Sequence, residues 1–162
     1  MKVYVINGPM GVGKTSVGKF LAESIPGTAF IDGDWCFDLH PFVGNAETKA
    51  MAVDNILHMI ANYGKCSHCK AVVLVWLMDD RWVYDRIIGG ITSLVMEPVP
   101  VTLMCSRDAL IARWKADDKC EWRTDEWLNV SLRSLSYFAA QDNCIDTTGM
   151  SVLQVTQIIL NQ

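Results

Sequence analysis

The sequence predicts an α/β fold with a mostly parallel β-sheet. Two observations lead to this prediction. Short apolar runs that are typical of strands alternate with segments of helical periodicity along the whole chain. The strongest strand, 71–78, is apolar throughout, so both of its faces should be covered by other elements. Strands that are separated by helices in this rhythm form parallel sheets.

The first half of the chain should contain the first two strands and two helices. The apolar run 2–7 is a strand that ends at a glycine, and a helix with recurring apolar residues then continues to Pro26-Gly27. A second strand is expected at 28–32. A longer helix is expected over 47–63, and Gly64 stands where a C-terminal cap belongs.

The second half repeats the alternation after the strand at 71–78. We expect a helix from Arg81 that is broken at Gly89-Gly90, and then a strand at 101–105 that Pro98 and Pro100 introduce.

The last part of the chain should add three helices around one short strand. Ser106 is the expected cap of a helix around 108–114, and a further helix is expected over 128–139. A brief strand at 144–146 precedes a final helix, for which Ser151 and Gln154 form a capping-box pattern.

Composition narrows the class of protein. The chain has 162 residues, with 51% hydrophobic and 20% charged residues, which excludes a disordered chain. We found no internal repeat or linker, so one domain, 1–162, is expected. A net charge of −4 argues against binding to nucleic acid or to a membrane surface. No leader-like segment opens the chain and its six cysteines are expected to be thiols, so we expect a cytoplasmic protein, monomeric or homodimeric.

One motif determines the expected chemistry. Residues 8–15, GPMGVGKT, fit the P-loop pattern G-x-x-x-x-G-K-[ST], between an expected strand and an expected helix. Glycines let backbone N–H groups approach an anion, the helix N-terminus adds further donors, and the lysine and threonine suit phosphates and Mg²⁺. The residues expected to bind ATP are Gly8, Pro9, Met10, Gly11, Val12, Gly13, Lys14, Thr15 and Ser16.

Two carboxylates follow the second expected strand. Asp32 and Asp34 flank Gly33, and residues at the carboxyl ends of parallel strands face the ligand crevice. One carboxylate, Asp32, is expected to hold Mg²⁺ together with Thr15, and Asp34 to accept the proton of an attacking hydroxyl. The alternative is a surface turn, in which Asp-Gly is common.

The chain resembles the small P-loop kinases related to shikimate kinase, gluconate kinase, chloramphenicol phosphotransferase and nucleotide kinases. The resemblance rests on VINGPMGVGKTSVGK, which ends at Lys19, on FIDGD at 30–34, on an arginine-bearing segment at 107–123, and on IDTTGMS at 145–151. It implies a P-loop NTPase fold with three layers, α/β/α, and a five-stranded parallel sheet in the order 2-3-1-4-5. It also implies a mobile lid at about 106–123 and an acceptor-binding segment at about 33–64.

The resemblance also implies roles for three residues outside the motif. Arg113 would lie near the nucleotide, Arg123 would reach the transferring phosphate or the acceptor, and Thr148 would lie in the loop along the adenine. Lys115 and Lys119 add positive charge to the same stretch, which suits a cationic lid. The alternative is a solvated helix face, because acidic residues are interspersed.

We therefore expect a Mg²⁺-dependent enzyme that moves the γ-phosphate of ATP to a small-molecule or nucleotide acceptor, with Lys14, Asp34 and Arg123 as catalytic residues. The alternative is a non-catalytic ATP-binding regulatory module. The unusual end of the 71–78 strand, where Asp79 and Asp80 follow, motivates this alternative. Residues 33–47 contain aromatic and acidic side chains but no arginine, which favours an unphosphorylated acceptor slightly.

Overall fold

The fold was obtained as a computed structural model, which describes residues 1–117, 120 and 123–162. The described chain forms a five-stranded parallel sheet in the order β2-β3-β1-β4-β5, which confirms the expected topology. The strands are β1 (Lys2–Asn7), β2 (Thr28–Asp32), β3 (Ala71–Val75), β4 (Glu97–Met104) and β5 (Cys144–Asp146).

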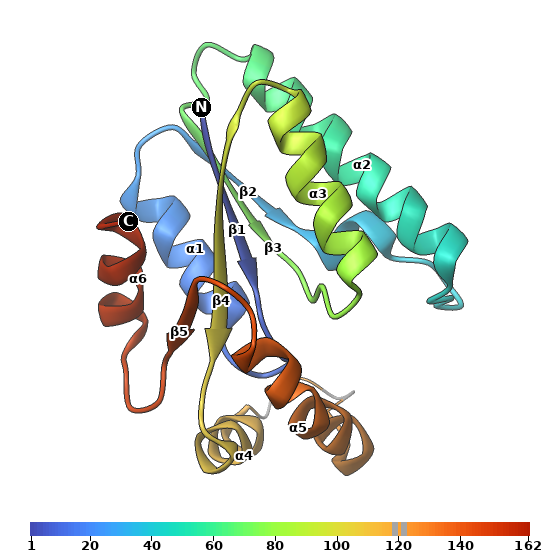
Figure 1. Cartoon of the computed structure of the whole chain (residues 1–162), viewed down its shortest axis with the longest axis vertical. Helices are drawn as coiled ribbons and strands as arrows, with labels where there is room; N and C mark the ends of the chain where they lie inside the picture. Colours follow the sequence, from blue (N-terminus) through green and yellow to red (C-terminus); the bar gives the residue numbers. More distant parts are fainter. Residues whose placement is uncertain (118–119, 121–122) are drawn as a thin grey trace.

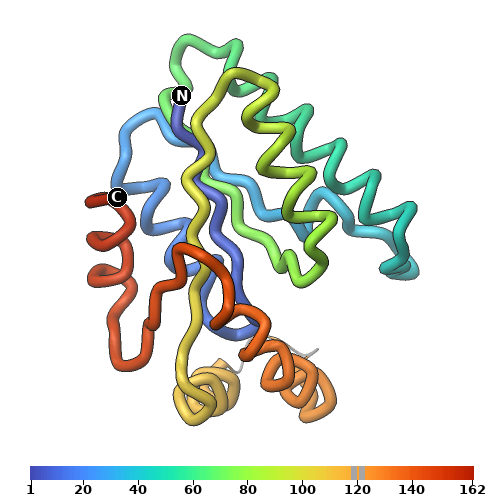
Figure 2. The backbone as a smooth tube through the Cα atoms, in the orientation of Figure 1, coloured from blue at the N-terminus to red at the C-terminus, as the bar shows by residue number. Residues whose placement is uncertain are grey.

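Helices cover both faces of this sheet, as expected (Figure 1). On one side lie α1 (Lys14–Ser24) and α6 (Val152–Leu160), and on the other lie α2 (Ala46–Lys65) and α3 (Arg81–Ser93). The short 3-10 helix η1 (Gly33–Phe37) follows β2. The backbone trace shows α4 (Arg107–Ala116) and α5 (Asp125–Ala139) beyond the carboxyl ends of the central strands, near the turn that follows β1 (Figure 2).

The core lies in two layers, one on each face of the sheet. Alternate residues of β1 point to opposite faces, so Ile6 packs with Leu21 of α1 whereas Val5 packs with Ile56 of α2. All four side chains are fully buried. In the centre of the sheet, Ile6 is in register with Val75 of β3 on one side and with Val101 of β4 on the other. This register brings the carboxyl ends of the central strands to one edge.

The expected elements are present, but three glycines do not have the expected roles. Gly64 lies inside α2, which continues to Lys65, and a Cβ there would collide with the Met96 side chain. Gly89 and Gly90 do not break α3, which runs through both of them. A Cβ on Gly90 would lie 2.5 Å from Leu57 Cδ1, so this glycine lets α3 approach α2 closely. The prediction of a cap and of a break was wrong because Gly64 and Gly90 make room for neighbouring side chains, whereas Gly89 has no neighbour within 4 Å of an added Cβ and simply continues the helix.

Pro98 and Pro100 lie inside β4 instead of introducing it. The N–H of Glu97 donates to Met1 O towards β1, whereas the N–H of Thr102 donates to Asn143 O on the opposite side. Residues 98 and 100 therefore direct their backbone nitrogens away from β1, on the side where pairing with β5 begins only at Thr102. An unpaired edge is where a strand tolerates proline.

Strand β3 ends at Val75, three residues earlier than expected. The following residues stay beside β1, since Trp76 N donates to Ile6 O at 3.2 Å. The apolar run reflects burial, because Trp76 and Met78 are both buried, rather than continued strand pairing.

None of the helices in the described part of the chain has the length and apolar character needed to cross a membrane.

Candidate functional site

Residues 8–13 form a tight turn between β1 and α1, and its conformation requires glycine. Gly8, Gly11 and Gly13 have φ angles of 143°, 79° and 105°, which L-residues with a Cβ rarely adopt. Gly11 also packs against α4, because a Cβ there would lie 2.9 Å from Cε3 of Trp114. The turn delivers the N-terminus of α1, with Gly13 as its N-cap, to the carboxyl edge of the sheet.

Two buried polar side chains hold this turn, and the sequence analysis missed both. Asn7 accepts hydrogen bonds from Gly8 N and Met78 N, both at 2.8 Å, and donates to Met78 O at 3.0 Å. Ser131 on α5 donates to Met10 O at 2.7 Å. A polar residue at the end of an apolar strand was a usable signal for Asn7, whereas nothing in the sequence links Ser131 to a loop 121 residues away.

The Lys14 side chain folds back over the turn. Its Nζ donates to Gly8 O at 2.8 Å and to Pro9 O at 2.9 Å. Burial lowers the pKa of Lys14 to about 8, against the opposing effect of the Asp34 and Asp32 carboxylates. A triphosphate would replace these carbonyl contacts and supply the negative charge that this ammonium group favours.

Asp32 and Asp34 face the same cavity as Lys14. Asp32 ends β2, and its Oδ1 accepts a hydrogen bond from Asp34 N at 3.2 Å, which fixes the turn into η1. Burial raises the pKa of the Asp32 carboxyl, while the Asp34 N–H and Lys14 lower it. Gly33 makes this turn possible because a Cβ there would collide with the ring of Trp76. Both carboxylates line the cavity, and Asp34 is at the same time exposed to solvent.

The cavity has a volume of about 1000 Å³ and lies at the carboxyl edge of the sheet. One end is formed by the turn and by the start of α1, where Thr15 and Ser16 are exposed to it. The other end carries Phe37 and Phe42, whose rings meet edge to face with centroids 5.1 Å apart. The cavity is thus large enough for two ligands, with a phosphate-binding end and a partly aromatic end.

The donor set at the phosphate-binding end fits Mg²⁺. The Thr15 hydroxyl and the Asp32 carboxylate are hard oxygen ligands that line the same cavity. Among the described residues, no group of three or more His, Cys, Asp or Glu side chains could hold a metal ion alone. A hydroxyl and one or two carboxylates, completed by phosphate oxygens, are the ligands with which Mg²⁺ binds at such sites.

Arg113 lines the cavity and joins three segments. It donates to Val12 O at 2.9 Å, to the Thr147 hydroxyl at 2.9 Å and to Thr147 O at 2.6 Å. Thr147, which the sequence analysis did not select, is buried and lines the cavity, whereas the Thr148 hydroxyl accepts from Ser106 N at 2.8 Å. Arg113 therefore connects the phosphate-binding turn to the β5–α6 loop.

Arg123 also lines the cavity. It forms an ion pair with Asp117 at 2.7 Å and lies over the Trp114 ring, 5.1 Å from its centroid. Its positive charge contributes to lowering the pKa of Lys14. Within the expected lid, residues 118–119 and 121–122, including Lys119, lie outside the described residues.

The two aspartates after β3 differ in their contacts, although both line the cavity. Asp80 is the N-cap of α3, where its Oδ1 accepts from Trp82 N at 3.1 Å, and its Oδ2 lies 3.6 Å from Lys49 Nζ. Asp79 is exposed, and its charge raises the pKa of Lys14. Asp80 is therefore held by the start of α3 and by Lys49, whereas the exposed Asp79 adds a second carboxylate to the same part of the cavity lining.

Trp35 of η1 lies outside the core and is not among the residues that line the main cavity. Its side chain is 73% exposed and lines a separate hollow of about 460 Å³ with His58 and Met59 of α2.

Comparisons with known proteins agree with this fold. Residues 5–131 match a family model described as an AAA domain. A gluconokinase from Sinorhizobium meliloti superposes with a TM-score of 0.73 at 18% identity, covering 99% of this chain and 90% of that one.

Two further solved structures have similar scores. The Deinococcus radiodurans tunicamycin resistance protein superposes with a TM-score of 0.71 at 20% identity, covering 99% of this chain and 94% of that one. A shikimate kinase from Bacteroides thetaiotaomicron superposes with a TM-score of 0.67 at 17% identity, covering 98% of this chain and 96% of that one. No curated protein matches the sequence. At these identities the likeness to the solved structures is one of fold.

Proposed function

Since this chain belongs to the AAA domain family, we propose that it is a Mg²⁺-dependent phosphotransferase that moves the γ-phosphate of ATP to a small hydroxyl compound. One observation carries the proposal: Lys14, Asp32 and Asp34, from two separate strand ends, line a single cavity of about 1000 Å³. A phosphate-binding turn alone would serve any nucleotide-binding protein. A carboxylate pair in the same cavity adds a group that can accept a proton, which a transfer to a hydroxyl requires.

The residues divide the reaction between them. Backbone N–H groups of residues 8–13 and the Lys14 ammonium bind the phosphates, and Thr15 and Asp32 hold Mg²⁺, which neutralises phosphate charge when bound. Asp34 accepts the proton of the acceptor hydroxyl as the hydroxyl oxygen bonds to the γ-phosphorus. The bond from that phosphorus to the oxygen of ADP breaks, and ADP leaves. Arg123 stabilises the charge on the transferring group.

Two segments complete the proposed enzyme. Residues 33–64 contribute the acceptor end of the cavity, supported by the presence of Phe37, Phe42 and Lys49 in its lining. Residues 106–123 act as the lid, supported by the cavity lining that Arg113 and Arg123 provide. Arg113 braces the nucleotide site through Val12 and Thr147 in addition to its charge.

The test measures ADP release from Mg·ATP over a panel of hydroxyl compounds that includes sugars, amino sugars, nucleosides and nucleoside monophosphates. Asp34→Asn should lower kcat by about 100-fold or more with little change in ATP affinity, because a general base contributes about 10²–10⁴. Asp85→Asn is the matched control, since Asp85 is an exposed carboxylate on α3 that pairs with Arg81 and does not line the described cavity.

Full turnover by Asp34→Asn on the true acceptor would refute the assigned role. Tight ATP binding without ADP release across the whole panel would instead support the non-catalytic ATP-binding module.

A further inference from the structure

The acceptor end of the cavity carries an excess of negative charge. The described cavity-lining residues in the two segments 33–64 and 76–83 include three carboxylates, Asp34, Asp79 and Asp80, and one cation, Lys49. The two arginines of α3 that could add positive charge form ion pairs with aspartates on the surface instead. Arg81 bonds to Asp85 at 2.8 Å and Arg86 to Asp54 at 3.0 Å, and neither lines the described cavity.

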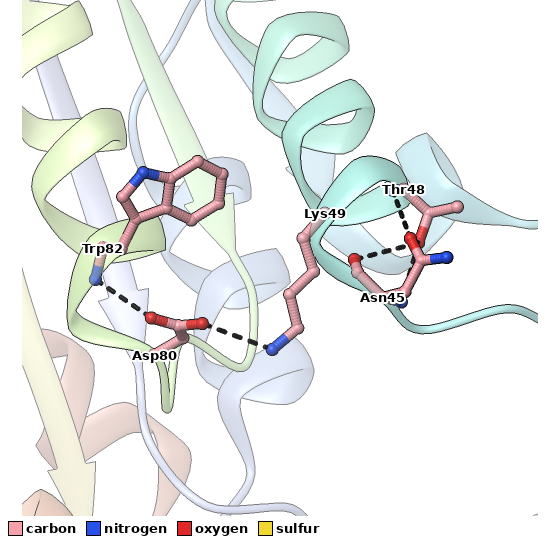
Figure 3. Close-up of polar contacts among 5 residues, drawn as sticks. All are labelled: Asn45, Thr48, Lys49, Asp80 and Trp82. Carbon is pink, nitrogen blue, oxygen red and sulfur yellow. Dashed lines mark hydrogen bonds and ion pairs between the residues drawn. The ribbon is translucent and has the colours of Figure 1, made fainter.

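Lys49 itself is neutralised by Asp80, and the two side chains bridge the starts of two helices (Figure 3). Lys49 Nζ lies 3.6 Å from Asp80 Oδ2. Helix starts fix both residues: Asp80 caps Trp82 N, and the capping box of Asn45 and Thr48 sets the first turn of α2, on which Lys49 lies. The pair therefore joins α2 to α3 across the acceptor end.

We propose that Asp80 masks Lys49 and so makes the cavity select a neutral or cationic hydroxyl acceptor and reject acceptors that carry a phosphate or carboxylate. This inference rests on the proposed phosphotransferase function and adds its substrate class. The positive groups at the other end, Lys14 and Arg123, are matched to the phosphates of ATP. The acceptor then meets three carboxylates and one lysine that is already paired, and like charges placed together are disfavoured.

An anionic acceptor that displaced Asp80 from Lys49 would gain little. The released Asp80 would still lie at the cavity wall with Asp34 and Asp79. A cationic or neutral acceptor instead keeps the pair intact, and its apolar parts can contact Phe37 and Phe42.

The first experiment compares three pyranose acceptors that differ in charge but little in shape, namely glucose, glucosamine and glucuronate. Wild-type protein should favour the neutral or amine-bearing member by at least tenfold in kcat/KM for ADP release. Asp80→Asn, which keeps an N-capping side chain, should lower this preference about tenfold by unmasking Lys49. The double variant Asp80→Asn/Lys49→Gln should restore it. A wild type that prefers the anionic member, or an Asp80→Asn variant with unchanged preference, overturns the inference.

A second experiment needs no turnover and no nucleotide. Lysines are reductively methylated with a ¹³C label, the Lys49 signal is assigned with Lys49→Arg, and inorganic phosphate is titrated. We expect a saturating shift of the Lys49 signal in Asp80→Asn and none in wild type, with exposed Lys65 as the internal control. Equal saturation in both proteins overturns the masking role. Absence of any ADP release would refute the phosphotransferase, yet this titration would still decide whether Asp80 masks Lys49.

Discussion

Binding of a triphosphate should draw a proton onto Lys14. In the free protein, burial holds the pKa of this ammonium at about 8 instead of 10.5, although Asp34 and Asp32 raise it. Phosphates placed against Nζ add several negative charges within contact distance, and opposite charge favours the protonated form. The Lys14 pKa should therefore return to 10 or above, by about two units or more, in the complex.

The size of the proton uptake follows from the shift. With a pKa of about 8, Lys14 is roughly half protonated at pH 8, about nine-tenths protonated at pH 7 and about one-tenth at pH 9. If the complex keeps Lys14 protonated throughout, binding takes up about 0.1 proton at pH 7, about 0.5 at pH 8 and about 0.9 at pH 9.

Isothermal titration calorimetry of a non-hydrolysable ATP analogue with Mg²⁺, in buffers of different ionisation enthalpy, measures this uptake directly. Lys14→Arg is the matched control, because arginine keeps the charge but stays protonated at every pH used. The uptake that rises with pH in wild type should be missing in this variant. An uptake that does not change between pH 7 and 9, or one that Lys14→Arg retains, would refute our account of Lys14.

Three further predictions concern stability. At pH 7, Asp32→Asn should raise the free energy of unfolding measured in urea. Burial raises the folded-state pKa of the Asp32 carboxyl above 3.8, so the ionised carboxylate destabilises the fold. The gain in stability should vanish as the pH falls below 3.8, because Asp32 is then protonated in both states. Gly89→Ala should stabilise α3 by about 0.5–1 kcal/mol, because nothing lies within 4 Å of the added Cβ. Gly90→Ala should instead destabilise α3, because its Cβ would collide with Leu57. Thermal unfolding of the two variants measures both effects. Asn7→Ala should lower the free energy of unfolding by about 2–3 kcal/mol, because two backbone N–H groups and one backbone carbonyl lose their hydrogen bonds to the Asn7 side chain. A loss below about 0.5 kcal/mol would contradict the role of Asn7 in holding the turn.

Local sequence patterns were sufficient to predict the strands, the helices and the position of the phosphate-binding turn, whereas the sheet order was expected only from the resemblance to small P-loop kinases. Alternating apolar runs mark strands and helices, and the motif at 8–15 lies between β1 and α1 as expected. The Asp32–Asp34 turn was predictable for the same reason, since the end of a parallel strand determines which edge a side chain reaches.

The remainder depends on contacts between residues that are far apart in the chain. Gly64 and Gly90 resemble a helix cap and a helix break in sequence, but each accommodates a side chain from another element, Met96 and Leu57 respectively. Ser131 reaches Met10 only because α5 lies under the turn. Lys49 stands two residues beyond the segment 33–47, and its pairing with Asp80 requires α2 and α3 to lie side by side.

The central claim is that one cavity brings the triphosphate of ATP and the carboxylates of Asp32 and Asp34 together. A crystal structure with Mg²⁺ and a non-hydrolysable ATP analogue tests it most directly. We predict phosphates in the turn of residues 8–15, a metal ion at the Thr15 hydroxyl, and an Asp34 oxygen facing open space next to the γ-phosphate. A nucleotide bound elsewhere, or an Asp34 side chain turned away from the γ-phosphate, would contradict the proposed phosphotransferase.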